Sequence, residues 1–133
     1  MTRIGRIGKC AVFYKQENIA YYVSLALIRP NQDIVNSYYL KYLIESIIGV
    51  RELRKRTLVN AVPIKINKDD IGKIILPIPS LEEQNKIAII LNKFEKLYND
   101  ISKSLPTEIE ARQKQYEYYR DKLLTFKELK VNE

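Results

Sequence analysis

The sequence predicts an α+β protein. A small mixed α/β part is expected in residues 1–79, followed in residues 80–133 by a long coiled-coil-type helix that is broken or kinked at Pro106. Three observations predict this. Short Tyr-, Val-, Leu- and Ile-rich runs alternate with turn residues up to position 79. Apolar residues then recur at gaps of four and three, as in a heptad seam. Apolar residues make up 46% of the 133-residue chain, which suits one domain with a modest core.

The first part is expected to contain short strands and one helix. Gly5 and Gly8 bracket a turn. Asn36 is expected to cap a helix that continues to about Leu53, because the apolar residues between them share one face. A part of this size has a marginal core unless something packs against it. The expected strands are residues 9–14, 20–28, 62–66 and 74–78, and the prolines in the last two make these edge or terminal strands.

The second part begins with a helix-start signal. Ser80 and Glu83 have the S-x-x-E spacing of a capping box, which predicts a helix from Leu81. A lone helix of this length cannot bury its apolar stripe, so it must pack on another helix of its own chain or of a partner. The expected seam is Ile87, Leu91, Phe94, Tyr98, Ile101 and Leu105.

Pro106 interrupts this helix. Its ring suits the first turn of a new helix, and Thr107 with Glu110 repeats the capping pattern. A single helix that is broken or kinked here is preferred to a hairpin. The seam expected after the break is Ile109, Tyr116, Tyr119, Leu123 and Phe126, with Arg112 at one position in step.

The positive charge belongs to the first part. The whole chain carries a net charge of +7, and residues 1–79 contain 13 Lys and Arg against 6 Asp and Glu. Residues 80–133 contain 10 of each kind. An anionic partner is therefore expected for the first part, and little intrinsic attraction to polyanions for the second.

Several classes of protein are excluded or disfavoured. One cysteine and no histidine rule out a disulfide framework within the chain, a His/Cys zinc site and a Ser-His-Asp triad. No apolar run approaches the roughly 18 to 20 residues that span a bilayer, and a signal-peptide stretch is missing at Met1, so a cytoplasmic protein is expected. The acidic pairs at 69–70 and 82–83 have turn and capping roles, and Glu128 with Lys130 lacks the paired aspartate of a nuclease. No catalysis, metal or cofactor is expected.

Two blocks carry a family resemblance. Residues 76–84 (LPIPSLEEQ), followed by Lys86, Ile87 and Leu91, resemble the junction between target-recognition domain and conserved spacer in specificity subunits of type I restriction–modification systems. Residues 105–124 resemble the end of that spacer. Residues 5–9 and 56–78 are similar to the second half of such a recognition domain, so the chain resembles a partial, half-length subunit.

The resemblance implies a division of labour. Recognition domains of this family lie on the DNA major groove and choose the sequence. Helical spacers pair with one another and carry methyltransferase subunits, while separate motor subunits translocate and cleave. Residues 1–79 are then expected to be a partial target-recognition domain and residues 80–133 a conserved spacer. A half-length subunit would dimerise to recognise a palindromic, interrupted site.

The candidate DNA contacts form two groups. Four cations stand where the first helix should end, and further hydrogen-bonding residues follow on the next loop: Arg51, Arg54, Lys55, Arg56, Thr57 and Asn60. The second group surrounds the glycine turn: Arg3, Arg6 and Lys9. Alternatively, the first group only satisfies a helix C-terminus and the second is solvated charge near a terminus.

The candidate subunit interface follows the seam. Tyr118 points away from it and is a candidate contact for a partner subunit. The complete set is Ile87, Leu91, Phe94, Tyr98, Ile101, Leu105, Ile109, Tyr116, Tyr118, Tyr119 and Leu123.

Two functional hypotheses follow. The first is a non-catalytic DNA sequence-specificity subunit. Its expected partners are double-stranded DNA, methyltransferase subunits, motor/nuclease subunits indirectly, and a second copy or another specificity subunit; no membrane is expected. The alternative is a truncated interaction protein without DNA binding, whose helix pairs with full-length specificity or methyltransferase subunits.

Overall fold

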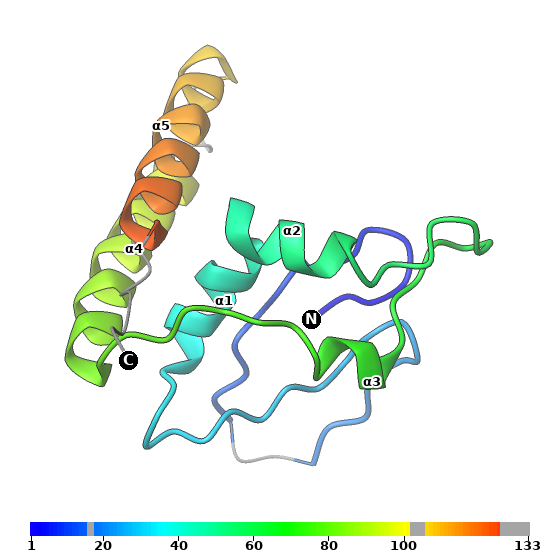
Figure 1. Cartoon of the computed structure of the whole chain (residues 1–133). Helices are drawn as coiled ribbons and strands as arrows, with labels where there is room; N and C mark the ends of the chain where they lie inside the picture. Colours follow the sequence, from blue (N-terminus) through cyan, green and yellow to red (C-terminus); the bar gives the residue numbers. More distant parts are fainter. Residues whose placement is uncertain (16–17, 102–105, 126–133) are drawn as a thin grey trace, which may run out of the picture.

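A computed structural model describes residues 1–15, 18–101 and 106–125, with the backbone alone at residues 100–101 and 106–109 (Figure 1). Within these residues the chain forms a helical hairpin on one side and a set of short helices and loops beside it. None of the described helices combines the length and the apolar character that a membrane crossing requires. The helices are α1 (Ser37–Glu45), α2 (Ile47–Arg54), α3 (Lys68–Ile71), α4 (Leu81–Ile101) and α5 (Pro106–Leu124).

Isolated β-bridges replace the predicted strands. Antiparallel bridges join Thr2 with Leu25, Ile4 with Lys65, and Leu58 with Lys65. The first segment of the chain therefore lies between two others, and its hydrogen bonds go to both. The Arg3 amide donates to the Ser24 carbonyl at 2.8 Å, and the Ile66 amide donates to the Arg3 carbonyl at 3.0 Å.

Two of the four predicted strands contribute to these bridges. Residues 20–28 supply Leu25 and residues 62–66 supply Lys65, whereas residues 9–14 and 74–78 supply no bridge in the described part of the chain. Side chains satisfy several of their backbone donors instead. The Cys10 amide bonds to Glu45 at 2.9 Å, and the Ile75 amide bonds to Glu52 at 3.3 Å. The regular structure is thus almost wholly helical, and the strand expectations are corrected accordingly.

The helix predicted from Asn36 to Leu53 is two helices. Asn36 caps α1 as predicted, because its side-chain oxygen accepts from the Tyr38 amide at 2.8 Å and the Tyr39 amide at 3.1 Å. The break falls at Ser46, which has an extended backbone with ψ of 169°. Its hydroxyl donates to the Leu43 carbonyl at 2.7 Å and accepts from the Gly49 amide at 3.4 Å, so one residue ends α1 and caps α2.

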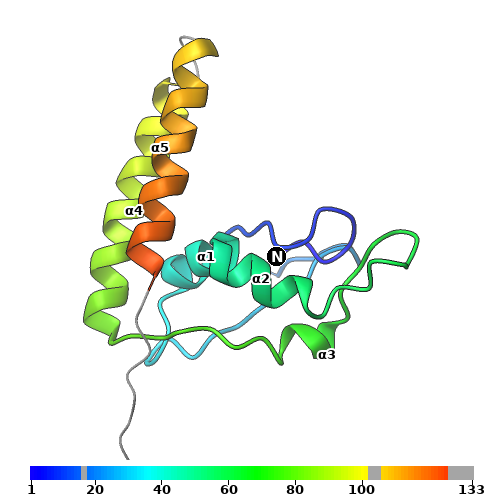
Figure 2. The ribbon, with the colours of Figure 1, turned by 45° about the horizontal axis from the view of Figure 1, so that its top comes forward.

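Helices α4 and α5 form an antiparallel hairpin (Figures 1 and 2). The Phe94 ring stacks on Tyr119 with a centroid separation of 5.7 Å. Further along α4, the Tyr98 hydroxyl donates to Gln113, earlier in α5, at 2.9 Å. The preference for a single kinked helix is therefore wrong. The position of the break is right, because α5 begins at Pro106, whose fixed φ suits a first helical turn.

Two apolar clusters form the core, and α1 belongs to both. The first joins α1, α4 and α5 through Tyr39, Tyr42, Leu43, Ile87, Ala88, Leu91 and Leu124. The second lies under the loops and joins Ala26, Ile44, Leu53, Ile66 and Ile71. Leu76 packs against both clusters. The hairpin thus supplies the cover that the small first part was expected to need. The functional division at residue 79 stays a prediction.

Candidate nucleic-acid interface

Positively charged segments meet at the end of the molecule opposite the hairpin. The turn of residues 5–8 and the segment of residues 54–65 lie together there, and we call them the basic tip (Figures 1 and 2). The chain segments that build and flank it, residues 1–15 and 53–68, contain nine Lys and Arg and no Asp or Glu. Such a surface attracts polyanions.

The glycine turn of the basic tip has a backbone that other residues adopt with strain. Gly5 and Gly8 have φ values of 73° and 92°, in the left-handed region. Thr2 closes the turn: its amide donates to the Lys9 carbonyl at 2.8 Å, and its hydroxyl accepts from the Lys9 amide at 3.0 Å. A Cβ on Gly8 would lie 2.9 Å from a methyl carbon of Leu53. The turn is therefore fixed against α2, with Arg6 exposed within it.

The neighbouring loop is tied to this turn. The Leu58 amide donates to the Lys65 carbonyl at 2.8 Å and closes the loop at its base. The Gly5 amide donates to the Ile64 carbonyl, also at 2.8 Å, and joins the loop to the turn. The Val62–Pro63 peptide bond within the loop is cis. Exposed Asn60 thus stands on a loop that is closed at its base and tied to the glycine turn.

The three cations predicted around the turn have different roles. Arg3 is a structural residue, because its guanidinium donates to the Val23 carbonyl at 2.9 Å and the Ile66 carbonyl at 3.0 Å. Arg6 is exposed on the tip. Lys9 is exposed too, but it lines a polar groove of about 240 Å³ beside α4 and α5. Of the three, Arg6 is thus the side chain that the structure leaves exposed within the tip itself.

The four cations at the end of α2 divide into two pairs. Lys55 and Arg56 both contact the carboxylate of Glu52, the latter at 3.1 Å, and the Glu52 side chain is only 12% exposed. The hydrogen bond from Lys55 is the main reason that the pKa of Glu52 lies below its usual value, and the bond from the Ile75 amide adds to it. Arg56 also donates to the Glu52 carbonyl near the helix end, at 3.2 Å. Both cations are thus engaged by Glu52 within the fold, and contact of this group with DNA stays a prediction.

Three further residues in and after α2 complete this picture. Thr57 also satisfies the helix end, since its hydroxyl donates to the Leu53 carbonyl at 2.8 Å. Arg51 and Arg54 are exposed, and neither forms an ion pair with an acid in the described part of the chain. Sequence reasoning missed the role of Glu52, although an acid three and four residues before the cations signals such pairs.

The hairpin joins the first part through Gln84, a residue of the family-like block whose role the sequence did not reveal. Gln84 is fully buried. Its amide nitrogen donates to the Ile34 and Pro79 carbonyls, both at 2.8 Å, and its oxygen accepts from the Asn36 amide at 2.9 Å. Nearby, the Tyr39 hydroxyl donates to the Pro77 carbonyl at 3.0 Å. The block therefore positions the hairpin on the start of α1.

A charged contact reinforces this junction. Lys41 bonds to both carboxylate oxygens of Glu95, at 2.6 and 2.7 Å, and the buried Tyr42 hydroxyl donates to Glu95 at 2.7 Å. Burial alone would raise the pKa of Glu95, but the hydrogen bonds from Lys41 and Tyr42 outweigh it, so this pKa lies below its usual value. Burial, in turn, raises the pKa of the Tyr42 hydroxyl strongly.

The predicted interface residues are partly used within the hairpin. Ile87 and Leu91 are buried, while Phe94, Tyr98, Tyr116 and Leu123 are half-buried. Tyr119 is 38% exposed and Tyr118 61% exposed. The side chains of Ile101, Leu105, Ile109 and Phe126 lie outside the described residues. Sequence reasoning missed the fully buried Leu124 and three exposed apolar residues on α4, which are Ile89, Ile90 and Leu97.

The described residues hold no group of three or more metal-ligating side chains. Asp70 bonds to Lys73 at 2.9 Å, and Lys86 contacts both Glu82 and Glu83 at 2.7 and 3.3 Å, so three of these four acids have an ion-pair partner. The Ser80 hydroxyl accepts from the Glu83 amide at 3.3 Å, as a helix cap requires. Glu128 and Lys130 lie outside the described residues.

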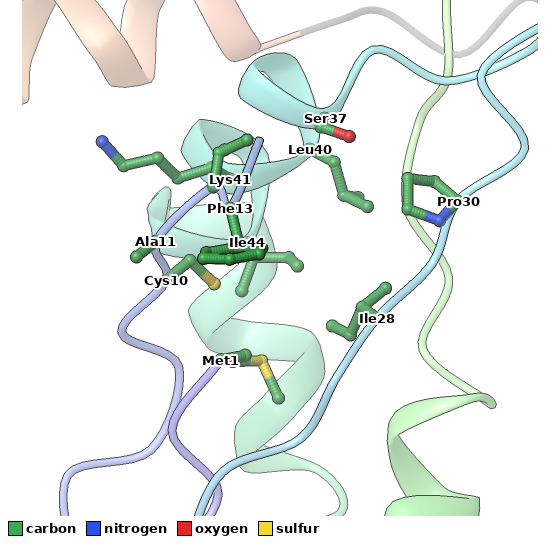
Figure 3. A pocket seen from close by; sticks show the side chains of 11 residues that line it. Met1, Cys10, Ala11, Phe13, Ile28, Pro30, Ser37, Leu40, Lys41 and Ile44 are labelled. Carbon is green, nitrogen blue, oxygen red and sulfur yellow. The ribbon is translucent and has the colours of Figure 1, made fainter. Parts of the chain in front are cut away.

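The lone thiol lines a pocket whose wall also includes the polar side chains of Ser37 and Lys41. Met1, Cys10, Phe13, Ile28 and Ile44 are among the side chains that surround this cavity of about 100 Å³ (Figure 3). Burial is the main reason that the pKa of Cys10 rises to about 11. The thiol is thus protonated at neutral pH, as expected for a structural cysteine.

Comparison with known proteins assigns the chain to a family. Residues 2–111 match the model of the type I restriction modification DNA specificity domain, and the chain belongs to this family. It is 39% identical over 100 residues to a type I restriction enzyme specificity subunit of Escherichia coli. The match covers 73% of this chain and 24% of that protein.

Other relatives carry similar names. A Haemophilus influenzae protein, named as a type I restriction enzyme specificity subunit, is 32% identical over 123 residues, covering 92% of this chain and 30% of the relative. A Mycoplasma pneumoniae protein, named as a type I specificity subunit, is 35% identical over 119 residues, which are 86% of this chain and 36% of the relative. The chain thus spans about a quarter to a third of these relatives. No solved structure gives a significant match.

Proposed function

We propose that this chain contributes DNA-sequence recognition to a type I restriction–modification complex and has no catalytic activity of its own. The basic tip and the adjoining end of α2 bind duplex DNA, with Arg6, Arg51 and Arg54 contacting phosphates and Asn60 facing the bases. The observation that carries this proposal is the charge of the segments that build and flank the tip, residues 1–15 and 53–68, which have nine cations and no acid. Contacts of this kind position a protein on DNA before bases are distinguished.

The hairpin is the proposed docking element for other subunits. Its charge is balanced, so it has little reason to bind DNA. Its exposed side includes Ile90 and Leu97, which are 40% and 57% exposed, and Tyr118 on α5. Such residues suit a protein interface. We assign methyltransferase subunits to this surface, with motor/nuclease subunits reached through them, and a second copy or another specificity subunit as the pairing partner.

One observation favours the alternative that the chain acts only as an interaction protein. Glu52 neutralises Lys55 and Arg56, and Arg3 is used within the fold, so fewer free cations remain than the sequence offered. In that case the hairpin alone would carry the function, by pairing with specificity or methyltransferase subunits.

Salt dependence of DNA binding distinguishes these functions. We would measure affinity for a duplex with randomised central positions at several salt concentrations, for the unaltered chain and for Arg51→Ala/Arg54→Ala. If the tip binds DNA, the variant should bind the duplex more weakly than the unaltered chain. The slope of log affinity against log salt concentration should also be smaller in magnitude by about 1 for each phosphate that the variant no longer neutralises. The matched control is Lys93→Ala/Lys96→Ala, which removes two exposed charges from α4. Equal slopes for all three proteins would exclude this site.

A further inference from the structure

The loop of residues 58–65 exposes apolar side chains within the basic tip. Val62 is 100% exposed and Val59 is 65% exposed. We propose that these two valines contact thymine methyl groups in the major groove of duplex DNA and so help to choose the sequence. This inference rests on the proposed function and assigns part of its base recognition to named residues.

The loop can present these side chains at defined positions. Its base is closed by the bond from the Leu58 amide to the Lys65 carbonyl, at 2.8 Å. The Gly5 amide donates to the Ile64 carbonyl of the loop at 2.8 Å, and within the loop the Ala61 amide donates to the Leu58 carbonyl at 3.2 Å. A projection held from both sides has little ordering cost on binding. Val62 stands free of the core, so its exposure serves no packing purpose within the described chain.

The surroundings of the loop match a DNA groove. Arg6 lies on the adjoining turn and Arg54 at the end of α2, at positions from which cations can contact phosphates. Exposed Asn60 lies between the two valines in the sequence, and its amide can pair with the N6 and N7 groups of adenine. Adenine and thymine are partners in one base pair. An amide beside apolar side chains thus fits the major-groove edge of A·T pairs.

Charge favours DNA over a protein surface as the occupant. An apolar projection alone would suit either. The apolar projection of residues 58–65 is flanked by cations, and residues 53–68 contain no Asp or Glu. The exposed apolar residues of α4, in contrast, lie in a segment (residues 80–133) with equal numbers of positive and negative residues. An apolar protein surface gains nothing from those cations, while the phosphates that border a groove do.

The test uses the whole chain and two kinds of duplex. A pool of duplexes with randomised central positions first yields the preferred sequence. Each thymine of that sequence is then replaced in turn by uracil, which removes only the methyl group from the major groove. Affinities are measured for the unaltered chain, Val59→Ala, Val62→Ala and the control Val23→Ala. Val23 is a valine of comparable exposure, 57%, on the opposite side of the N-terminal segment.

The proposal predicts a specific pattern. At one or more positions uracil weakens binding of the unaltered chain roughly fourfold, the factor that corresponds to about 0.8 kcal/mol for one methyl group removed from water. Val59→Ala or Val62→Ala loses this sensitivity and keeps the salt slope, whereas Val23→Ala behaves like the unaltered chain.

Three other results would overturn the proposal. If the chain selects a sequence with a normal salt slope but tolerates uracil everywhere, or if both loop variants keep the uracil sensitivity, the valines do not read methyl groups and the proposed function stands. If no duplex is bound in a salt-dependent way, the proposed function fails as well, and the exposed loop belongs to a protein interface.

Discussion

Replacing Leu91 with alanine tests whether the hairpin covers the first part of the same chain. Leu91 is fully buried in the cluster that joins α1, α4 and α5. Truncation removes three carbon groups, or about 2.4 kcal/mol at roughly 0.8 kcal/mol each. The cavity that remains raises the expected loss in the free energy of unfolding to about 3–5 kcal/mol. The neighbouring Ile90 is 40% exposed, so Ile90→Ala should cost only about 1.5 kcal/mol by the same rule.

Urea unfolding followed by far-UV circular dichroism measures both losses, at two protein concentrations that differ tenfold. Because the contact lies within one chain, the loss for Leu91→Ala should be the same at both concentrations. A loss no larger than that of Ile90→Ala would refute the packing of α4 on α1. A loss that shrinks at the higher concentration would instead assign the cover to a second chain.

Two further predictions concern the turn and the junction. Gly8→Ala should destabilise the protein by about 1–3 kcal/mol more than Gly5→Ala, because both have positive φ but only Gly8 meets Leu53, at 2.9 Å; equal losses in urea unfolding would contradict the close contact. Burial raises the pKa of Glu95, but the hydrogen bonds from Lys41 and Tyr42 lower it by more. The pKa of Glu95 therefore lies below its ordinary value of 4.5. Stability from this carboxylate is thus present above pH 4.5 and lost as the pH falls through the lower, folded value. In thermal unfolding from pH 7 to 3, the advantage over Glu95→Gln should disappear at the acidic end, and a constant advantage would be evidence against the ion pair.

Local signals were the most predictable part of the fold. Asn36 and Ser80 cap helices as expected, because a short polar side chain before an apolar run satisfies free amides wherever the helix lies. Ile87 and Leu91 are buried as the seam predicts. The break before Pro106 is also where the sequence places it. Each of these features depends on residues within a few positions of one another.

Features that depend on distant partners were not predictable. A heptad seam requires a partner helix but does not say whether that helix belongs to the same chain, so the hairpin was missed. Ser46 separates α1 from α2, but the apolar pattern around it is equally consistent with one continuous helix. At the candidate interface, the sequence shows the cations of α2 but not that Glu52 points at Lys55 and Arg56 and is buried beside them. The bridges between residues 1–5 and 64–66 likewise join segments that are far apart in the chain.

Helix α1 gives the two proposed activities a common physical support. Its Tyr39 and Leu43 pack with the hairpin, while its Ile44 packs in the cluster under the loops together with Leu53, which contacts the glycine turn of the basic tip. Interiors of this kind are close-packed and transmit displacement, because a side chain cannot move without moving its neighbours. Subunits that fix the hairpin would therefore also fix the orientation of the basic tip. In this arrangement the proposed docking surface at one end and the proposed DNA contacts at the other would be connected without an additional hinge.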